Sequence, residues 1–281
     1  MNPFLLAAIG PVVHHPFQFG LWRLQFTGFG IAVVMSFVVA QMISQQELQR
    51  RGYDPEPMAD MVIGAIVGGL LGAKLYFVFV LGNRDALWTR GGFVFWGGLI
   101  GGTIGVLLVA RYKRVPLLRV VEVSAPALAA AYAVGRTGCW TVGDDYGRPW
   151  SGPLAVQFPE GAPPSTAGIM TSEFGVRFPE GTDPATLVAV HPTQLYEVAM
   201  GIAMFAIIWR LRGHQHREGW LLGVYLVTAG VERFVVEFFR AKDDRLPVGL
   251  TLAQVIAVSA LALGVAWLYA LRARRTSVVS A

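Results

Sequence analysis

Long runs of apolar residues, separated by shorter polar connectors, dominate the hydrophobic pattern of this chain. Seven of these runs approach or exceed the ~20 residues that an α-helix needs to cross about 30 Å of hydrocarbon. We therefore predict an all-α integral membrane protein, folded as a single polytopic domain over residues 1–281. The predicted transmembrane helices cover residues 24–45, 58–82, 92–110, 118–140, 193–211, 219–239 and 249–271.

One polar stretch, residues 141–192, is much longer than the other connectors. It contains two similar pieces, VQFPEGAPPSTA from Val156 and VRFPEGTDPATL from Val176. Each piece begins with alternating apolar residues and then reaches a Pro-Glu-Gly turn, a pattern that favours a short β-strand. We predict that this stretch is a small head, inserted on the extracytoplasmic face, with a strand at the start of each piece.

Basic residues are unevenly distributed between the connectors at the two ends of the predicted helices. Cytoplasmic loops of membrane proteins carry an excess of lysine and arginine, so the richer side is predicted to be cytoplasmic. This places the C-terminus in the cytoplasm and the N-terminus outside. The richer side carries Arg50, Arg51, Arg111, Lys113, Arg114, Arg119, Arg210, Arg212, Arg217, Arg272, Arg274 and Arg275. The opposite connectors carry Arg84, Arg90, Arg240, Lys242 and Arg245.

Composition agrees with a membrane protein and narrows its chemistry. Of the 281 residues, 54% are hydrophobic and 15% are charged, whereas a typical soluble domain has about 25% charged residues. The net charge of +5 is modest, so we do not predict nucleic-acid binding. Cys139 is the single cysteine, which excludes a disulfide within the chain. The five histidines are scattered, and no ligand spacing indicates a metal site or another cofactor.

Charged residues inside the predicted helices are the strongest indication of function. A charge at the centre of a membrane helix costs ~2.5–3.5 kcal/mol on insertion scales, so it usually serves a site. Several residues within these helices or at their ends are of this kind: Lys74, Arg136, Arg233, Glu237 and Arg240.

Arg233, Glu237 and Arg240 are predicted to share one helical face, because they are four and seven residues apart. One interpretation is an internal ion pair between Arg233 and Glu237. Another is a site for a lipid phosphate, because the planar donor fork of a guanidinium suits phosphate oxygens. Arg136 lies at a similar depth on another predicted helix, and this favours the phosphate site.

Three other features have a structural interpretation. The glycine-rich segments 64–76 and 93–105 are typical of closely packed membrane helices. His191 precedes a predicted helix at the membrane surface, where a histidine more often forms a cap or a hydrogen bond than acts as a base. Cys139 lies one helical turn from Arg136, and we interpret it as a small buried thiol rather than a nucleophile.

Several motifs resemble those of one bacterial enzyme family. GRTGCWTVGDDYG, residues 135–147, is similar to the signature G-R-x-G-N-F-x-N-x-E-x-x-G of prolipoprotein diacylglyceryl transferases. GGLLGAKLY, WGGLIGGTIG, HPTQLYE and RFVVEFFR occur in that family's order and at its approximate spacing. The resemblance implies a multi-pass protein of the bacterial inner membrane with a periplasmic-side site. It also implies transfer of diacylglyceryl from phosphatidylglycerol to the lipobox cysteine of a secreted precursor protein.

The family's functional residues can be placed on this chain one by one. Arg136 and Gly147 fall on the arginine and the final glycine of the signature, and Asp144 takes the place of its glutamate. Arg233 and Glu237 fall on the corresponding residues of the late motif. We expect both arginines to neutralise the leaving glycerol phosphate, Glu237 to hold Arg233, and Asp144 to bind the acceptor or take its proton. The predicted substrate-binding residues are Arg136, Gly147, Cys139, Trp96, His191 and Arg240.

The chain also departs from the family pattern at further positions. Trp96 stands where the family has a histidine, and Cys139 where the signature has an asparagine. Thr27 and Ala229 stand where tyrosines are expected. An indole cannot accept a proton, so any role of that histidine in deprotonating the thiol must pass to another group. The alternatives are a lipid transferase with a different acceptor, a non-catalytic phospholipid-binding protein and a transporter.

Overall fold

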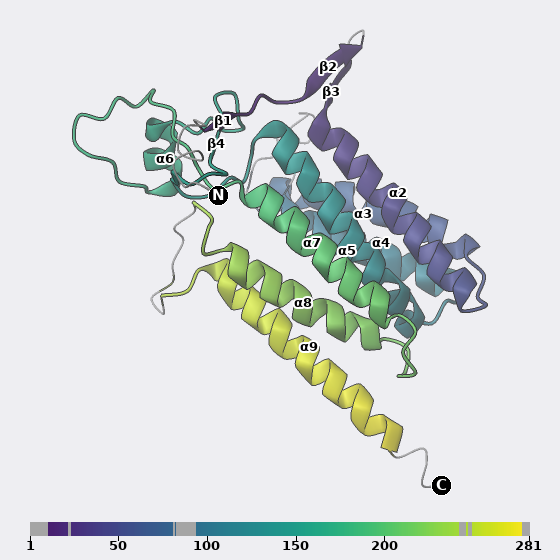
Figure 1. The fold of residues 1–281 in the computed structure, drawn as a ribbon. Coiled ribbons are helices and arrows are strands. Elements are labelled where there is room, and N and C mark those ends of the chain that lie inside the picture. The colour runs from purple at the N-terminus through teal and green to yellow at the C-terminus, as the bar shows by residue number, and fades with distance from the viewer. Residues whose placement is uncertain are drawn as a thin grey trace. The chain divides into compact units, whose positions relative to one another are not determined.

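The computed structural model describes residues 11–21, 24–80, 82, 94–241, 246 and 249–276, and most of these residues are helical (Figure 1). Some positions used for the predictions lie outside the described residues. They are residue 81 of the second predicted helix, residues 92–93 of the third, and the basic residues Arg84, Arg90, Lys242 and Arg245.

Six of the described helices are long and apolar enough to cross a membrane. The chain is thus a multi-pass helical membrane protein, as the hydrophobic pattern predicts. The six helices are α2 (Gly28–Arg50), α3 (Glu56–Phe79), α4 (Phe95–Tyr112), α5 (Leu117–Val142), α7 (Thr193–Leu211) and α9 (Leu252–Thr276).

The sixth predicted transmembrane helix, residues 219–239, is shorter in the structure. α8 (Trp220–Val236) has 17 residues and ends before Arg240. The backbone of Arg240 instead forms an isolated β-bridge with Gly147. The prediction that Arg240 shares a helical face with the two charged residues before it is therefore wrong, because this bridge takes the chain out of the helix.

The chain forms two compact units. Unit 1 comprises residues 1–36, 128–216 and 223–281, and unit 2 comprises residues 37–127 and 217–222. Three helices, α2, α5 and α8, begin in one unit and end in the other. The charged residues of the predicted catalytic site all belong to unit 1.

Glycines bring α3 and α4 of unit 2 into backbone contact. A methyl group on Gly68 would collide with the carbonyl of Gly101, and one on Gly72 would collide with the carbonyl of Gly97. Because a glycine has no side chain, the two helices can approach this closely. The interpretation of the two glycine-rich segments as packing surfaces is confirmed.

Two small sheets of unit 1 flank the ends of its helices. β4 (Val156–Gln157) lies in the segment that connects α5 to α7. It pairs in parallel with β1 (Val12–Val13), near the start of the chain. β2 (Gln18–Leu21) pairs antiparallel with β3 (Leu24–Thr27), and this hairpin continues directly into α2 (Figure 1). The N-terminal part of the chain is therefore joined to the segment between α5 and α7 through β1.

The strand predicted at Val156 is confirmed as β4, whereas the one predicted at Val176 is wrong. Val176 follows Gly175, which adopts the left-handed conformation that ends α6 (Ala167–Phe174). The amide of Val176 donates to the carbonyl of Met170 at 3.0 Å. It is thus bonded to the preceding helix and not to a neighbouring strand.

Candidate active site

The end of α5 carries Arg136 and Cys139, one helical turn apart. The helix closes at Gly143, whose φ is 68°. The amides of Gly143 and Asp144 each donate at 3.2 Å, to the carbonyls of Trp140 and Cys139 respectively. This is a Schellman motif, in which glycine adopts the left-handed conformation without strain. It turns the following acidic residues back towards the helix end.

Arg136 contacts three side chains. Its Nε donates to Oε2 of Glu197 at 2.6 Å, and its Nη2 also contacts this oxygen. Its Nη1 donates to Oδ2 of Asp145 at 3.0 Å and to Sγ of Cys139 at 3.3 Å. Glu197 comes from α7, and its side chain is 1% exposed. A deeply buried carboxylate of one membrane helix is therefore paired with an arginine of another.

Two more arginines approach from α8 and the segment after it. Arg240 Nη2 donates to Oδ1 of Asp145 at 2.7 Å. Arg233 Nη2 lies 2.9 Å from Oε2 of Glu237, which confirms the predicted ion pair. Nη1 of Arg233 and Nη1 of Arg240 lie 3.6 and 3.9 Å from Oε1 of Glu197. Three arginines thus surround one buried glutamate.

The side chains that make these contacts form an arginine–carboxylate cluster with balanced formal charge. Its members are Arg136, Arg233, Arg240, Asp145, Glu197 and Glu237. Burial of charges is tolerated when each has a partner and further hydrogen bonds. Arg233 is the most exposed of the three arginines, with 32% of its side chain accessible. An anionic ligand can therefore reach a guanidinium of the cluster from outside.

The first residues of α7 hold the backbone of the acidic loop. Thr193 Oγ1 donates to the carbonyl of Asp145 at 2.6 Å, and Gln194 Nε2 donates to that of Asp144 at 2.6 Å. Both donors are fully buried. The two aspartates are thus fixed relative to Glu197, which lies one turn further along α7.

Asp144 and Asp145 are neighbours with opposite ionisation behaviour. Burial, together with the negative charge of Asp145, raises the pKa of Asp144 to about 6. A hydrogen bond with Cys139 and the charges of Arg136 and Arg240 lower this pKa, but they do not outweigh the burial. Burial also disfavours the ionised form of Asp145, but Arg240 and Arg136 outweigh it and hold this pKa below its usual range. Oδ1 of Asp144 is buried and accepts no hydrogen bond from the described residues. Asp144 is therefore suited to taking up a proton near neutral pH.

The sequence spacing indicates no metal site, yet three potential ligands meet in the structure. Ligand atoms of Cys139, Asp144 and Asp145 lie within 4.8 Å of one another. Both carboxylate oxygens of Asp145 already accept hydrogen bonds from arginines. These nearby cations oppose the binding of a further positive charge. The arrangement fits proton transfer better than metal binding.

Gly147 occupies a position that admits no side chain. Its amide donates to the carbonyl of His191 at 2.9 Å. A methyl group on Gly147 would collide with the carbonyl of Phe239 and with the side chain of His191. Gly147 therefore joins the acidic loop to the segments before α7 and after α8. Only glycine fits at this position, because any side chain would collide with these segments.

His191 is held in a ring of aromatic side chains. It stacks on Trp150 with ring centroids 4.3 Å apart, and its Nδ1 lies 3.2 Å from the hydroxyl of Tyr196. Burial lowers the pKa of His191, so the ring is neutral at pH 7. These contacts agree with the interpretation of His191 as a hydrogen-bonded residue at the start of α7.

Trp96 is the predicted site residue that belongs to unit 2. It lies in the first turn of α4, is 43% exposed and meets the ring of Phe95 edge-on. Of the other departures from the family pattern, Thr27 accepts a hydrogen bond from the amide of Gly30 at 3.1 Å and so caps α2. Ala229 lies within α8.

Two members of the arginine–carboxylate cluster, Glu197 and Asp145, were not among the predicted site residues. Glu197 lies inside the predicted helix 193–211, so the high cost of a charge in a membrane helix was a signal that could have identified it. Asp145 has no such signal. It adjoins Asp144, to which the signature assigns the glutamate position, and its two arginine partners become apparent when the chain is folded.

Comparison with known proteins bears directly on the chemistry of this cluster. Residues 16–270 match the prolipoprotein diacylglyceryl transferase family. The chain belongs to this family. The resemblance inferred from the motifs is therefore confirmed, and it extends over both units.

Three relatives show how far the similarity extends. A protein of Clostridium tetani is 29% identical over 258 residues, which cover 89% of this chain and 95% of the relative. One of Corynebacterium diphtheriae is 29% identical over 280 residues, covering 93% and 95%. One of Trichormus variabilis is 29% identical over 296 residues, covering 99% and 96%. Each is named a phosphatidylglycerol–prolipoprotein diacylglyceryl transferase.

Proposed function

We propose that this protein transfers the diacylglyceryl group of phosphatidylglycerol to the thiol of a prolipoprotein lipobox cysteine. The observation that carries the proposal is the convergence of three arginines on the buried Glu197, in a chain of this transferase family. Guanidinium groups gathered close to the end of membrane helices, one of them 32% exposed, suit a lipid headgroup phosphate. The names of the relatives supply the donor lipid and the acceptor protein.

The reaction is a displacement at the glyceryl carbon that bears the phosphate. The sulfur of the acceptor thiolate forms a bond to this carbon, and the carbon–oxygen bond to the phosphate breaks. Glycerol phosphate leaves with the electron pair and gains a negative charge. Arg136 and Arg233 neutralise this charge through their guanidinium forks, and Glu237, 2.9 Å from Arg233, keeps that fork in place.

Asp144 takes the proton of the acceptor thiol. A cysteine thiol has a reference pKa of ~8.5, so it requires a base at neutral pH. With a pKa of about 6, Asp144 is mostly ionised there and can accept the proton. Cys139 and Gly147 shape the acceptor side of the site, while His191 and Arg240 hold the segments around it. Trp96 stands in place of the family's histidine and carries no proton.

The orientation follows from the distribution of basic residues. The C-terminus lies in the cytoplasm of a bacterium, the N-terminus and the head of residues 141–192 lie outside, and the inner membrane is the setting. The cluster then lies near the outer face of this membrane, because α5 leads directly into the head. This is the face at which a secreted precursor presents its cysteine.

The test is a transfer assay with the full-length protein in nanodiscs that contain phosphatidylglycerol. A synthetic lipobox peptide serves as the acceptor, and the same peptide with serine in place of cysteine serves as the control. We expect release of glycerol phosphate and an equal amount of peptide that has gained a diacylglyceryl group. Arg177→Ala is the matched protein control, because Arg177 is an exposed arginine of the head outside the cluster.

Two results would contradict the proposal in different ways. Release of glycerol phosphate without modification of the cysteine peptide would indicate another acceptor, as the tryptophan at position 96 allows. Retention of phosphatidylglycerol by the purified protein without either product would indicate a lipid-binding protein that has no transferase activity.

A further inference from the structure

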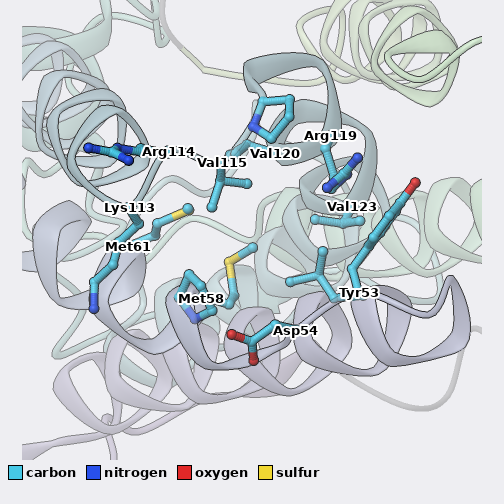
Figure 2. A pocket seen from close by; sticks show the side chains of 13 residues that line it. Tyr53, Asp54, Met58, Met61, Lys113, Arg114, Val115, Arg119, Val120 and Val123 are labelled. Carbon is cyan, nitrogen blue, oxygen red and sulfur yellow. The ribbon is translucent and has the colours of Figure 1, made fainter.

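Unit 2 contains a cavity of about 210 Å³, and none of the residues assigned to the transfer reaction lines it. It lies where the connector between α2 and α3 meets the connector between α4 and α5. Its apolar lining includes Met58, Met61, Val115, Val120 and Val123 (Figure 2). Pockets that enclose a drug-sized ligand measure about 300–1,000 Å³, so this cavity fits a headgroup rather than a whole lipid.

Two cations that line the cavity are neutralised within unit 2. Lys113 Nζ lies 2.5 Å from a carboxylate oxygen of Asp60. Arg119 Nε donates to Glu218 at 3.1 Å, and its guanidinium lies 3.5 Å from the centre of the Tyr53 ring. These side chains already have their partners and are part of the wall.

Arg114 and Asp54 are the charged lining residues that remain without an ion pair among the described residues. Figure 2 shows them on different sides of the cavity. Oδ1 of Asp54 accepts the amide of Glu56 at 3.0 Å, a neutral contact that leaves its charge uncompensated. The cavity therefore offers one cation and one anion, separated by an apolar lining.

The backbone at Arg114 indicates that its side chain has a use. α4 ends in a Schellman motif, with the amides of Arg114 and Val115 donating to the carbonyls of Arg111 and Ala110 at 3.3 and 2.9 Å. Arg114 occupies the left-handed position of this motif, with a φ of 57°, whereas α5 has Gly143 at the same position. A residue with a side chain is strained there and glycine is not. In a chain with 33 glycines, keeping an arginine at this position favours a function for the guanidinium.

We propose that the cavity binds the headgroup of a zwitterionic aminophospholipid, with its phosphate on Arg114 and its ammonium group on Asp54. A guanidinium and a carboxylate on separate walls match the two charges of such a headgroup. The apolar lining receives the glyceryl end, and the cavity lies at helix ends, where headgroups are found. Phosphatidylglycerol has the same phosphate but carries a neutral glycerol in place of the ammonium group, so it offers Asp54 no cationic partner.

The test uses the full-length protein in nanodiscs and two photoactivatable lipids with the label next to the glyceryl group. One probe is a phosphatidylethanolamine and the other is a phosphatidylglycerol. After illumination, labelled peptides that cover residues 53–61 and 113–123 are quantified by mass spectrometry. We expect stronger labelling of these peptides by the phosphatidylethanolamine probe. Equal labelling by the two probes would overturn the proposal.

Variants of the two charged residues separate their contributions. Arg114→Gly removes the guanidinium and the backbone strain together, and should lower labelling by both probes about tenfold. Asp54→Asn keeps the acceptor for the Glu56 amide and should reduce labelling by phosphatidylethanolamine to the level of phosphatidylglycerol. Arg111→Gln is the matched control, because Arg111 is a nearby exposed arginine outside the lining, and it should change nothing.

Two further outcomes would contradict the inference. An equal loss of labelling in Arg111→Gln would assign the effect to general surface charge. Loss of labelling when millimolar inorganic phosphate is present during illumination would assign the cavity to free phosphate. Transfer of diacylglyceryl is measured in the same nanodiscs and should be unchanged in Arg114→Gly. A wild-type protein that fails to transfer diacylglyceryl would therefore contradict the proposed function alone. Labelling that does not depend on the lipid headgroup would contradict the proposed cavity ligand alone.

Discussion

Each unit buries a glutamate that is paired with arginine, but the other partners of the two glutamates differ. In unit 2, Glu122 accepts hydrogen bonds from Arg51 at 2.9 Å and from the backbone amides of Gly219 and Leu221 at 2.8 and 2.9 Å. In unit 1, Glu197 is equally buried and meets arginine side chains from α5, α8 and the segment after α8.

This difference separates a structural carboxylate from one that can take part in binding. Backbone amides are fixed by the fold, so a carboxylate that they hold belongs to the framework. Arginine side chains can turn from a carboxylate to a phosphate, because each offers two oxygens that the guanidinium fork can contact at once. We therefore expect changes in the cluster of unit 1 to affect catalysis, and changes around Glu122 to affect stability.

The largest expected effect is the loss of activity in Arg136→Ala. Removing one preorganised donor to a developing negative charge typically lowers a rate about 10²–10³-fold. Arg136→Lys should recover little, because an ammonium group lacks the fork that contacts two oxygens at once. The measurement is the transfer rate in nanodiscs at saturating peptide, with the amount of folded protein determined in parallel. Nearly full activity of the alanine variant would refute the role of Arg136 in neutralising the phosphate.

The second expected effect is a loss of stability in Arg51→Ala without a change in catalysis. Removing one partner of a buried ion pair typically costs about 3–5 kcal/mol, because the other charge stays buried. The side chain of Arg51 is 17% exposed, so we expect a value near the lower end. Thermal unfolding in nanodiscs gives the stability, and the transfer rate per folded molecule should equal that of the wild type. A slower reaction in the folded fraction would contradict the distinction between the two glutamates.

The smallest expected effect is a pH dependence due to Asp144. The rate should fall about tenfold for each pH unit below the pKa, because only the ionised carboxylate accepts the thiol proton. Half of the maximum should be reached near pH 6. Asp144→Asn should be slower and should lose this dependence. A wild-type rate that stays constant between pH 7 and pH 5 would exclude Asp144 as the base.

The same carboxyl group links pH to stability with a definite sign. Folding raises the pKa of Asp144 from 3.8 to about 6, so the folded protein holds this proton more tightly than the unfolded chain. The contribution of Asp144 to the free energy of unfolding is therefore fully present below pH 3.8 and decreases as the pH rises to about 6. Asp144→Asn should remove this decrease.

Helical spacing predicts one part of the cluster and cannot predict the rest. The pair of Arg233 and Glu237 follows from a separation of four residues, and its distance of 2.9 Å confirms it. The contact between Arg136 and Glu197 joins residues 61 positions apart, and the contact between Arg240 and Asp145 joins residues 95 apart. Such contacts depend on how the helices pack, which no local pattern specifies.

The same contrast applies to the fold. A long apolar run satisfies its own backbone hydrogen bonds as a helix, so the hydrophobic pattern is sufficient to predict membrane helices. A strand needs a partner, and the residues at Val156 find one in β1. The similar residues at Val176 follow α6 and bond back to it. Two similar pieces of sequence therefore adopt different structures because their neighbours differ.

The hydrogen bonds of Glu122 have a consequence for the synthesis of the protein. Its amide partners, Gly219 and Leu221, are made 97 and 99 residues later, after residues 128–216 of unit 1. Until the ribosome reaches them, a carboxylate already inserted with α5 lacks two of its final donors. In a translation product that stops before residue 217, we expect Glu122 to remain without these two amide donors. The cell's quality-control proteases would then have a way to distinguish it from a finished chain.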